Sequence, residues 1–270
     1  MSLHGKVAIV TGAAGGFGTV LVRALRAEGA KVAALDVKSH PPTDGVLPIT
    51  ADIADYAACK EAVESTLKEL GGLHILVNNG ALGLQVIRPD HMTRLIDIEE
   101  ISPETWQRFM AVNLSGAWNM TRAAIGHLRR QRWGRIVNVT TSFFTMLRGG
   151  FQPYGPAKAG LEAMSAAHAE EFRASGVTVN VVVPGGPANT SMVPSESGLD
   201  RAALVQPEVM APPVVFLCSE TAGAVTGNRY VAAHWPTDKP PAEAEAQCRA
   251  PIAWPQLAQD PVWPGGKPKA

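Results

Sequence analysis

The sequence predicts an α/β fold with a single doubly wound parallel sheet and helices on both of its faces. Three observations predict it. Short β-branched runs alternate with longer stretches of helical periodicity, the short runs are almost continuously hydrophobic, and no segment is repeated. Parallel strands have this character because helices bury both of their faces. With 270 residues, 46% hydrophobic and 18% charged, the chain has ample material for one such core.

The predicted elements follow each other regularly along the chain. Gly29, Gly71 and Gly176 follow three of the predicted helices, as glycine often does, and Pro103 begins another. The expected strands are 6–11, 31–36, 45–50, 74–77, 135–140, 177–183 and 229–232, and the expected helices are 17–28, 56–70, 104–132, 154–174 and 207–219.

Two segments do not fit this alternation. Residues 82–102 form a long connection of mixed polarity, and residues 236–270 hold eight of the 21 prolines together with Trp254 and Trp263. We therefore divide the chain into a domain at 1–235 and a Pro-rich C-terminal arm at 236–270. Such a composition cannot build its own core. The arm is either a disordered tail or a segment that packs on a neighbouring subunit or beside the substrate cleft.

Composition excludes several classes of function. The formal net charge is zero, so we expect neither nucleic acid nor an acidic membrane surface as a partner. The three cysteines form no CxxC pair, which indicates a reducing compartment. The seven histidines are scattered, so no metal site is expected. The first five residues are too short and polar for a signal peptide, and no stretch is long enough to span a membrane. A soluble cytoplasmic protein is the expectation.

A glycine-rich turn joins the first predicted strand to the first helix. It reads Thr-Gly-Ala-Ala-Gly-Gly-Phe-Gly over residues 11–18. Glycines let such a turn bring backbone amides close to a pyrophosphate, and the next helix directs its positive N-terminus at the phosphates. The position of the turn, more than its glycines, predicts a Rossmann-type dinucleotide site at Gly12, Gly16, Phe17 and Gly18.

The spacing of this turn is TGxxxGxG, and with it the chain resembles the short-chain dehydrogenase/reductase family. The resemblance runs from residue 5 to about residue 233 and is carried, in the family's order, by the glycine turn, Asp36, Asp52, Asn78-Asn79-Gly80-Ala81, Asn113, Tyr154-x-x-x-Lys158 and Pro184-Gly185. It implies an oxidoreductase that uses a nicotinamide cofactor.

Asp36 ends the second predicted strand and indicates which nicotinamide cofactor is used. A carboxylate there can accept hydrogen bonds from the ribose hydroxyls and would repel a 2′-phosphate. A strand-ending Asp is also an ordinary turn residue. The glycine turn holds no Arg or Lys, although Lys38 follows two residues after Asp36. The sequence therefore predicts NAD in preference to NADP.

The resemblance assigns further residues to the cofactor. Asp52 and Ile53 would bracket the adenine, and Asn78, Asn79 and Gly80 would line the adenosine side. The family usually shows NNAG where this chain shows NNGA. After the sixth strand, Pro184 and Gly185 would cover the nicotinamide, and Thr190 would bond its carboxamide or the phosphates.

Tyr154 and Lys158 are four residues apart in a helical segment and so share one face. A free tyrosine has a pKa of about 10. A nearby ammonium and the positive nicotinamide would lower that pKa, so that the phenolate could exchange a proton with an alcohol. Lys158 would also bind the nicotinamide ribose.

A hydroxyl residue and an asparagine complete the predicted catalytic set. The family's serine lies 13 positions before the tyrosine, where this chain has Thr141, followed by Ser142. Adjacent residues leaving a strand point in opposite directions, so we predict Thr141, with Ser142 as the alternative. Asn113 falls inside a helix, where Asn is disfavoured. The resemblance implies that it holds a water linked to the lysine.

The loops around this predicted centre indicate the substrate. The candidate contacts are mostly apolar and comprise Ser142, Phe143, Phe144, Met146, Leu147, Arg148, Phe151 and Met192. Arg148 could bind a carboxylate or face solvent.

We expect an NAD-dependent oxidoreductase acting on an apolar or aromatic secondary alcohol. The alternatives are a non-catalytic NAD-binding regulator and an NADP-linked ketone or 3-oxoacyl reductase. Resembling proteins pair through the helices that begin near residues 104 and 154, which predicts a homodimer or homotetramer.

Overall fold

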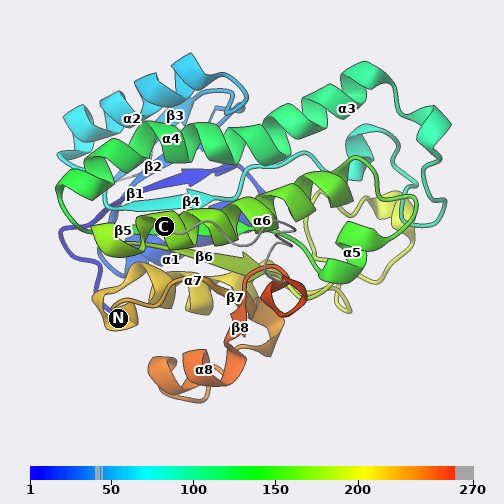
Figure 1. The fold of residues 1–270 in the computed structure, drawn as a ribbon. Coiled ribbons are helices and arrows are strands. Elements are labelled where there is room, and N and C mark those ends of the chain that lie inside the picture. Colours follow the sequence, from blue (N-terminus) through cyan, green and yellow to red (C-terminus); the bar gives the residue numbers. More distant parts are fainter. Residues whose placement is uncertain (40–42, 44, 259–270) are drawn as a thin grey trace, which may run out of the picture.

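One eight-stranded sheet forms the centre of the computed structural model, which describes residues 1–39, 43 and 45–258 (Figure 1). The strand order is β3-β2-β1-β4-β5-β6-β7-β8, and every neighbouring pair is parallel except β7 and β8. The strands are β1 (Val7–Thr11), β2 (Lys31–Asp36), β3 (Val46–Thr50), β4 (Ile75–Asn78), β5 (Gly134–Val139), β6 (Val177–Val183), β7 (Asn228–Val231) and β8 (Ala250–Pro251). The predicted doubly wound sheet is confirmed, with β8 added to it.

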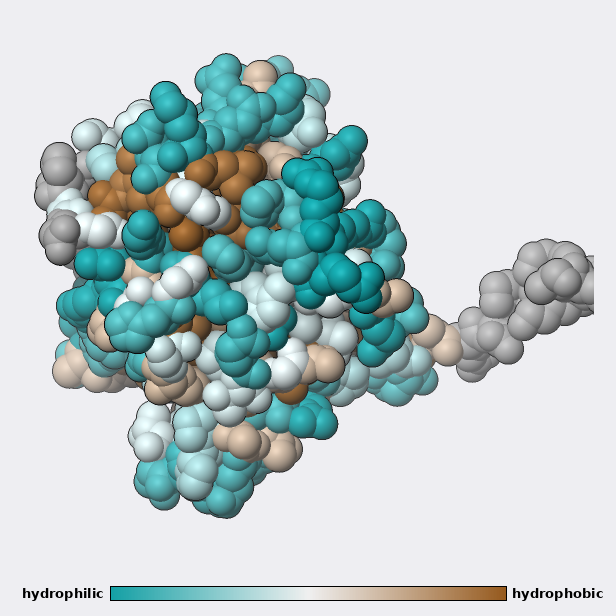
Figure 2. Space-filling model, turned by 90° about the vertical axis from the view of Figure 1, so that its left-hand side faces the viewer, coloured by the Kyte–Doolittle hydropathy of each residue, from teal (hydrophilic) through white to brown (hydrophobic). Residues whose placement is uncertain are grey.

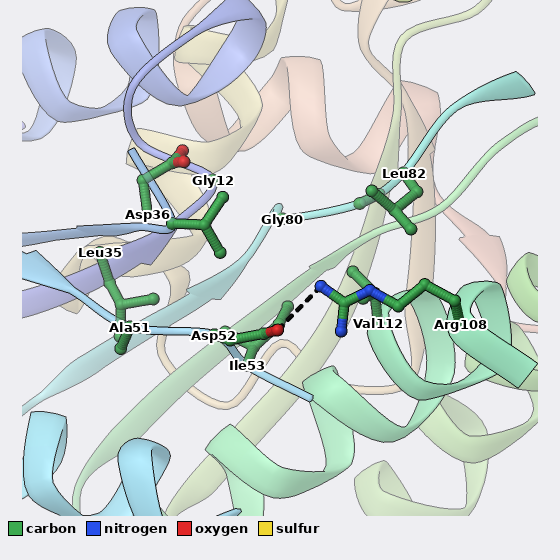
Figure 3. A pocket seen from close by; sticks show the side chains of 12 residues that line it. Gly12, Leu35, Asp36, Ala51, Asp52, Ile53, Gly80, Leu82, Arg108 and Val112 are labelled. Carbon is green, nitrogen blue, oxygen red and sulfur yellow. Dashed lines mark ion pairs between the residues drawn. The ribbon is translucent and has the colours of Figure 1, made fainter. Parts of the chain in front are cut away.

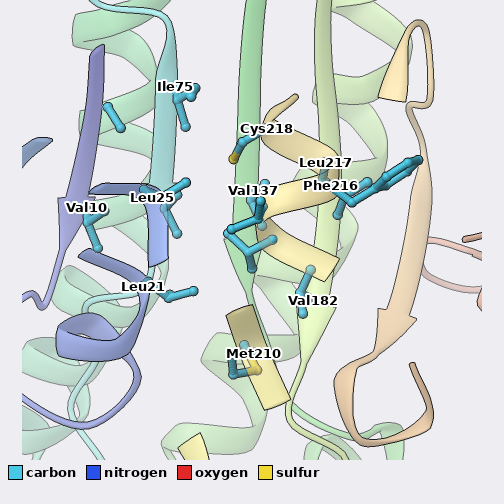
Figure 4. Packing of buried hydrophobic residues seen from close by; sticks show 14 of the residues in the cluster. Val10, Leu21, Leu25, Ile75, Val137, Val182, Met210, Phe216, Leu217 and Cys218 are labelled. Carbon is cyan, nitrogen blue, oxygen red and sulfur yellow. The ribbon is translucent and has the colours of Figure 1, made fainter. Parts of the chain in front are cut away.

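Helices cover both faces of the sheet because successive strand residues point to opposite sides. Val10 packs on the side of α1 (Gly16–Ala27) and α7 (Ala211–Cys218), as Figure 4 shows. Its neighbour Ile9 packs on the side of α2 (Tyr56–Leu70), α4 (Gly116–Arg130) and α6 (Tyr154–Phe172). Two apolar cores therefore hold the strands rigidly from both sides.

The strand order reverses between β1 and β4. These two strands are neighbours in the sheet, although β2 and β3 lie between them in the sequence. In open α/β sheets, ligands bind at the carboxyl ends of the strands beside such a reversal. Figure 1 shows the loops that follow β1, β4 and β5 gathered at this end, beneath α3 (Pro103–Met110) and beside α5 (Phe143–Leu147).

The long helix predicted at 104–132 is interrupted. It consists of α3, a π-helical turn at Ala111–Ser115 and then α4. The connection at 82–102 contains two short 3₁₀ turns, and its Leu84 and Ile96 pack against Phe109 of α3. This connection therefore forms a wall beside the carboxyl ends of the strands.

Residues 236–258 fold back onto their own chain. They form α8 (Pro241–Cys248) and the short strand β8, which pairs antiparallel with β7. A disordered tail is therefore wrong for this part of the predicted arm, and Trp263 lies outside the described residues. In the face drawn in Figure 2, hydrophobic residues are visible over a limited area that hydrophilic side chains surround.

Candidate active site

The glycine turn after β1 needs its glycines because backbone comes close to backbone. Gly12 has φ +65°, and a Cβ atom there would lie 2.7 Å from Cα of Gly80. A Cβ atom on Gly18 would lie 1.9 Å from the carbonyl oxygen of Gly12. Phe17 packs against the core from the first turn of α1. The turn is thus packed closely against the end of β4.

The end of β4 is tied to this turn by side chains. The Thr11 hydroxyl accepts hydrogen bonds from the backbone N–H groups of Asn79 (3.0 Å) and Gly80 (2.9 Å). The Asn79 amide donates back to the carbonyls of Thr11 and Gly12. Glycine in third place of NNGA suits the close approach of residue 80 to Gly12. The Asn79 side chain therefore holds the first residues of the glycine turn in place through their backbone carbonyls.

Asn78 does not line the adenosine side, so that expectation is wrong. Its side chain is 3% exposed and donates to Asn138 Oδ1 (2.8 Å) and to the Thr121 hydroxyl (3.3 Å). Alternation along the strand explains the difference, because Asn78 points into the helix-covered interior. It links β4 to β5 and α4.

A cavity lies between the glycine turn and the ends of β2, β3 and β4 (Figure 3). Its lining is mostly apolar, with three charged side chains, and comprises Gly12, Leu35, Asp36, Val37, Ala51, Asp52, Ile53, Gly80, Ala81, Leu82, Arg108 and Val112. Asp36 Oδ2 accepts from the Ala14 backbone N–H (3.0 Å), and Oδ1 accepts from that of Lys38 (3.0 Å). This carboxylate borders the cavity beside the glycine turn, where it can accept hydrogen bonds from the ribose hydroxyls of the adenosine half of a dinucleotide.

Arg108 was not predicted from the sequence. It reaches from α3 across the cavity, where its Nη2 atom lies 2.8 Å from Asp52 Oδ2 (Figure 3). The two residues are 56 positions apart, so no local spacing signals the pair. Ile53 packs beside them and leaves no room for a side chain on Gly116. The ion pair closes the side of the cavity opposite Asp36.

At the other end of the cleft, Tyr154 and Lys158 lie on one face of α6. Burial raises the pKa of Tyr154 to about 12, although a hydrogen bond with Thr141 works in the opposite direction. Lys158 is 2% exposed and donates to the Val139 carbonyl (2.8 Å), and burial lowers its pKa to about 8. The expected lowering of the tyrosine pKa by the ammonium is not seen, since the Lys158 Nζ atom is 6.0 Å from the ring centroid and burial dominates.

The two candidate hydroxyls have different partners. Ser142 caps α5, and its Oγ atom accepts from the Thr145 backbone N–H (3.1 Å) and lies 2.9 Å from the Thr145 hydroxyl. Thr141 is the one that lies near enough to the Tyr154 hydroxyl to lower the pKa of that phenol. The local geometry therefore favours Thr141 as the hydroxyl of the site.

Asn113 occupies the π-helical turn and is 1% exposed. Its amide donates to the Leu82 carbonyl (2.8 Å), and its oxygen accepts from the Leu82 backbone N–H (2.7 Å). These two bonds tie the turn to the segment after β4. The predicted link from Asn113 through a water to Lys158 stays a prediction.

The turn after β6 lies against the glycine turn. Gly185 has φ +110°, and Pro184 accepts a hydrogen bond from the Ala233 backbone N–H (3.0 Å). A Cβ atom on Gly16 would lie 3.3 Å from the Thr190 methyl group, so the Thr190 side chain faces the phosphate end of the cleft. The turn after β6 is therefore a neighbour of the glycine turn, and its role in covering the nicotinamide stays a prediction.

The predicted substrate side is apolar and open. Phe144 and Leu147 are 70% and 78% exposed. The Arg148 guanidinium lies over the Phe151 ring at 4.6 Å and is exposed. Met192 borders the cleft next to Gly83. Met146 is on the buried side of α5, so it does not join Phe144 and Leu147 on the open apolar surface, and its prediction as a substrate contact is not supported.

The described part of the chain contains neither a candidate metal site nor a candidate membrane-spanning helix. Over residues 1–39, 43 and 45–258, no group of three His, Cys, Asp or Glu residues could hold a metal ion. Within the same ranges, none of the helices combines the length and the apolar character that crossing a membrane requires.

Comparison with known proteins agrees with the resemblance seen in the sequence. The family model of the short chain dehydrogenases matches residues 6–198. The chain therefore belongs to the short chain dehydrogenase family and is an oxidoreductase of that family.

Several members of the family are similar over most of the chain. The acetoacetyl-CoA reductase of Paracoccus denitrificans is 32% identical, and the match covers 84% of this chain and 96% of that protein. The 3-oxoacyl-[acyl-carrier-protein] reductase of Escherichia coli is 31% identical with the same coverage. The crystal structure of 3-ketoacyl-(acyl-carrier-protein) reductase from Brucella melitensis, complexed with NADH, is 28% identical with a TM-score of 0.73, and covers 84% of this chain and 96% of that chain.

Proposed function

We propose that this oxidoreductase transfers a hydride between a secondary alcohol or its ketone and NAD. The observation that carries the proposal is the Asp36 carboxylate, which is held beside the glycine turn by the Ala14 backbone N–H at 3.0 Å. A carboxylate in that place suits the ribose hydroxyls of NAD and repels the 2′-phosphate of NADP. The similar Brucella protein was crystallised with NADH.

The chain's residues have separate tasks in this proposal. Gly12, Gly16 and Gly18 let the backbone approach the pyrophosphate, while Asp52 and Ile53 border the adenine. Pro184, Gly185 and Thr190 cover the nicotinamide end. The nicotinamide supplies the hydride acceptor or donor.

Tyr154 exchanges the alcohol proton as the hydride moves. Thr141, which bonds the Tyr154 side chain, orients the substrate oxygen. The buried Lys158 binds the nicotinamide ribose. Burial raises the pKa of Tyr154 to about 12, and a positive nicotinamide bound beside it would lower that pKa.

The substrate is proposed to be an apolar or aromatic secondary alcohol, because Phe144 and Leu147 present exposed apolar surface beside the cleft. A second candidate is the reduction of a 3-oxoacyl thioester. The names of the Paracoccus and Escherichia relatives favour it, and the apolar side of the cleft would also suit an acyl chain. The protein is also proposed to form a homodimer or homotetramer whose subunits pair through the helices α4 and α6.

Fluorescence titration of the purified protein with NADH and with NADPH is the first test. We expect saturation with NADH and at least tenfold weaker binding of NADPH. Tighter binding of NADPH would contradict the role of Asp36 and favour the thioester reduction. Binding of neither would contradict the oxidoreductase proposal as a whole.

Turnover assays then separate an enzyme from a cofactor-binding regulator. The Tyr154→Phe variant removes the proton-exchanging hydroxyl and keeps the ring. We expect kcat on secondary alcohols with NAD, or on acetoacetyl thioesters with NADH, to fall by roughly 10²- to 10⁴-fold. NADH affinity should stay within about threefold of the wild type, because the phenol is not in the adenosine cavity. A wild-type protein that binds NADH but turns over no substrate would favour the regulator.

A further inference from the structure

Glu162 is a buried carboxylate that the proposed mechanism does not use. It follows Lys158 by one helical turn and Tyr154 by two, so all three lie on one face of α6. Its side chain is fully buried. Oε2 accepts a hydrogen bond from the Thr140 hydroxyl (2.7 Å), and Oε1 accepts one from the backbone N–H of Ala253 (3.2 Å). This carboxylate therefore joins the end of β5 to the C-terminal region.

Arg229 of β7 is the ionic partner of Glu162, with its Nε atom 3.1 Å from Oε1 and its side chain 7% exposed. Its Nη2 atom also donates to the backbone carbonyl of Thr141 (2.7 Å). The same guanidinium lies over the ring of Phe143 at 4.1 Å. A single planar cation thus contacts the carboxylate, the backbone of the proposed catalytic threonine and the ring two residues further on.

The C-terminal strap, which we define as residues 250–254, holds this pair from outside. Its β8 portion pairs with β7, where Ala250 lies opposite Arg229. Ile252 is 3% exposed and packs against β6. The Trp254 ring centroid is 5.5 Å from that of Phe143. Both Arg229 and the strap lie outside the residues 6–198 that the family model matches.

Ala253 has φ +60°, a left-handed conformation that an alanine rarely adopts. Such a conformation is unfavourable for a residue with a Cβ atom and persists only where the surrounding contacts require it. Here the conformation accompanies the hydrogen bond from its N–H to Glu162. The strap is therefore tied to the catalytic helix by more than apolar packing.

We propose that Glu162, Arg229 and the C-terminal strap position Thr141 for the reaction, so that the far C-terminal region completes the active site of its own chain. The proposal rests on the proposed role of Thr141. Residues 140–143 are held at three successive points: the Thr140 hydroxyl, the Thr141 carbonyl and the Phe143 ring. These contacts fix the backbone of Thr141 and leave its hydroxyl for Tyr154. A displacement of about 1 Å in such a group can lower a rate by about a hundredfold.

Substitutions at Ala253 test the link between strap and carboxylate. Ala253→Pro removes the N–H and cannot adopt a positive φ, whereas Ala253→Gly keeps the N–H and adopts that φ readily. For the proline variant we expect at least tenfold faster amide hydrogen exchange over residues 140–147 and kcat lowered by about tenfold. NADH affinity should stay within twofold of the wild type, because the adenosine cavity includes no part of the strap. The glycine variant should match the wild type in all three measurements.

Arg229→Lys tests the guanidinium and remains informative if Ala253→Pro does not fold. Lysine keeps a charge for Glu162 but cannot contact the Thr141 carbonyl and the Phe143 ring at the same time. We expect kcat about tenfold lower, unchanged NADH affinity and faster exchange over residues 140–147.

Two results would overturn the positioning role. The first is unchanged exchange and unchanged kcat in both Ala253→Pro and Arg229→Lys. The second is a parallel fall of stability, NADH affinity and kcat, which would indicate a general structural role. A wild-type protein without turnover would count against the proposed function, whereas the exchange measurements would still decide whether the strap holds residues 140–147.

Discussion

The adenosine end and the reacting end of the cleft are held in place by different kinds of contact. At the adenosine end, the contacts involve the backbone of the glycine turn: Gly12 lies against the backbone of Gly80, and the Asp36 carboxylate accepts from a backbone N–H of the turn. At the reacting end, side chains distant in sequence converge: Arg229 and Glu162 hold the residues around Thr141. The adenosine end therefore depends on the close approach of backbone segments, and the reacting end depends on polar contacts between residues distant in sequence.

Crowding the glycine turn should have the largest effect. A Cβ atom on Gly18 would lie 1.9 Å from the Gly12 carbonyl oxygen, so Gly18→Ala must displace the turn. We expect NADH affinity to fall by more than about a hundredfold, with roughly 1–3 kcal/mol of stability lost to overpacking. Fluorescence titration and thermal unfolding would measure both. Gly15→Ala is the matched control, because a Cβ atom there meets nothing within 4 Å. Equal affinities in the two variants would contradict the close-approach account.

The Asp36 carboxylate should control cofactor choice at the same end. We expect Asp36→Ala to shift the ratio of NADH to NADPH affinity by about ten- to fiftyfold towards NADPH, since the repulsion of a 2′-phosphate is removed. Parallel titrations with the two cofactors measure the ratio. Asp55→Ala is a suitable control, because that carboxylate caps α2 outside the adenosine cavity. A ratio that stays at the wild-type value would show that Asp36 is not the selector.

At the reacting end, the buried Lys158 should lower the stability of the folded protein. Burial lowers its pKa to about 8, against 10.5 for the exposed group. Between these pH values the unfolded chain keeps a proton that the folded chain has lost, so the contribution of Lys158 to stability rises with pH across this window. At pH 7 the folded protein holds a buried ammonium. Lys158→Met removes that cost but leaves the Val139 carbonyl without its donor.

We therefore expect Lys158→Met to be about 2 kcal/mol more stable than the wild type at pH 7. The difference should shrink as the pH rises from about 8 towards 10.5, and turnover should be lost. Denaturant unfolding at several pH values measures the difference. Lys60→Met, on the exposed side of α2, controls for the general effect of removing a charge. A variant less stable than the wild type at pH 7 would refute the buried-ammonium account.

The same contrast explains how much could be predicted from the sequence. All seven predicted strands occur within one residue of their expected ends, because buried parallel strands carry a continuous hydrophobic signal. Gly12, Gly18 and Asp36 were recognisable because their spacing follows directly from β1 and β2. The spacing of Thr141, Tyr154 and Lys158 was likewise local to β5 and α6.

The rest depends on contacts between distant residues. Arg108 joins Asp52 across the cavity, and Arg229 joins Glu162 from a strand 67 positions away. The strand β8 has two residues, too few for any periodicity, and its position is set by pairing with β7. Asn78 was misjudged because the sequence does not show which face of β4 is turned to the cleft.

Removing Arg108 should have the smallest effect, although its side chain crosses the adenosine cavity. The Arg108 and Asp52 side chains are 47% and 38% exposed, and ion pairs this exposed contribute about 0–1 kcal/mol. We expect Arg108→Met to change NADH affinity by less than about fivefold and to leave the unfolding temperature almost unchanged, because methionine keeps most of the apolar stem beside the cavity. Arg122→Met, on the exposed face of α4, is the matched control. A much larger loss of affinity, confined to Arg108→Met, would mean that a long-range side-chain contact also governs the adenosine end, and the contrast between the two ends would then fail.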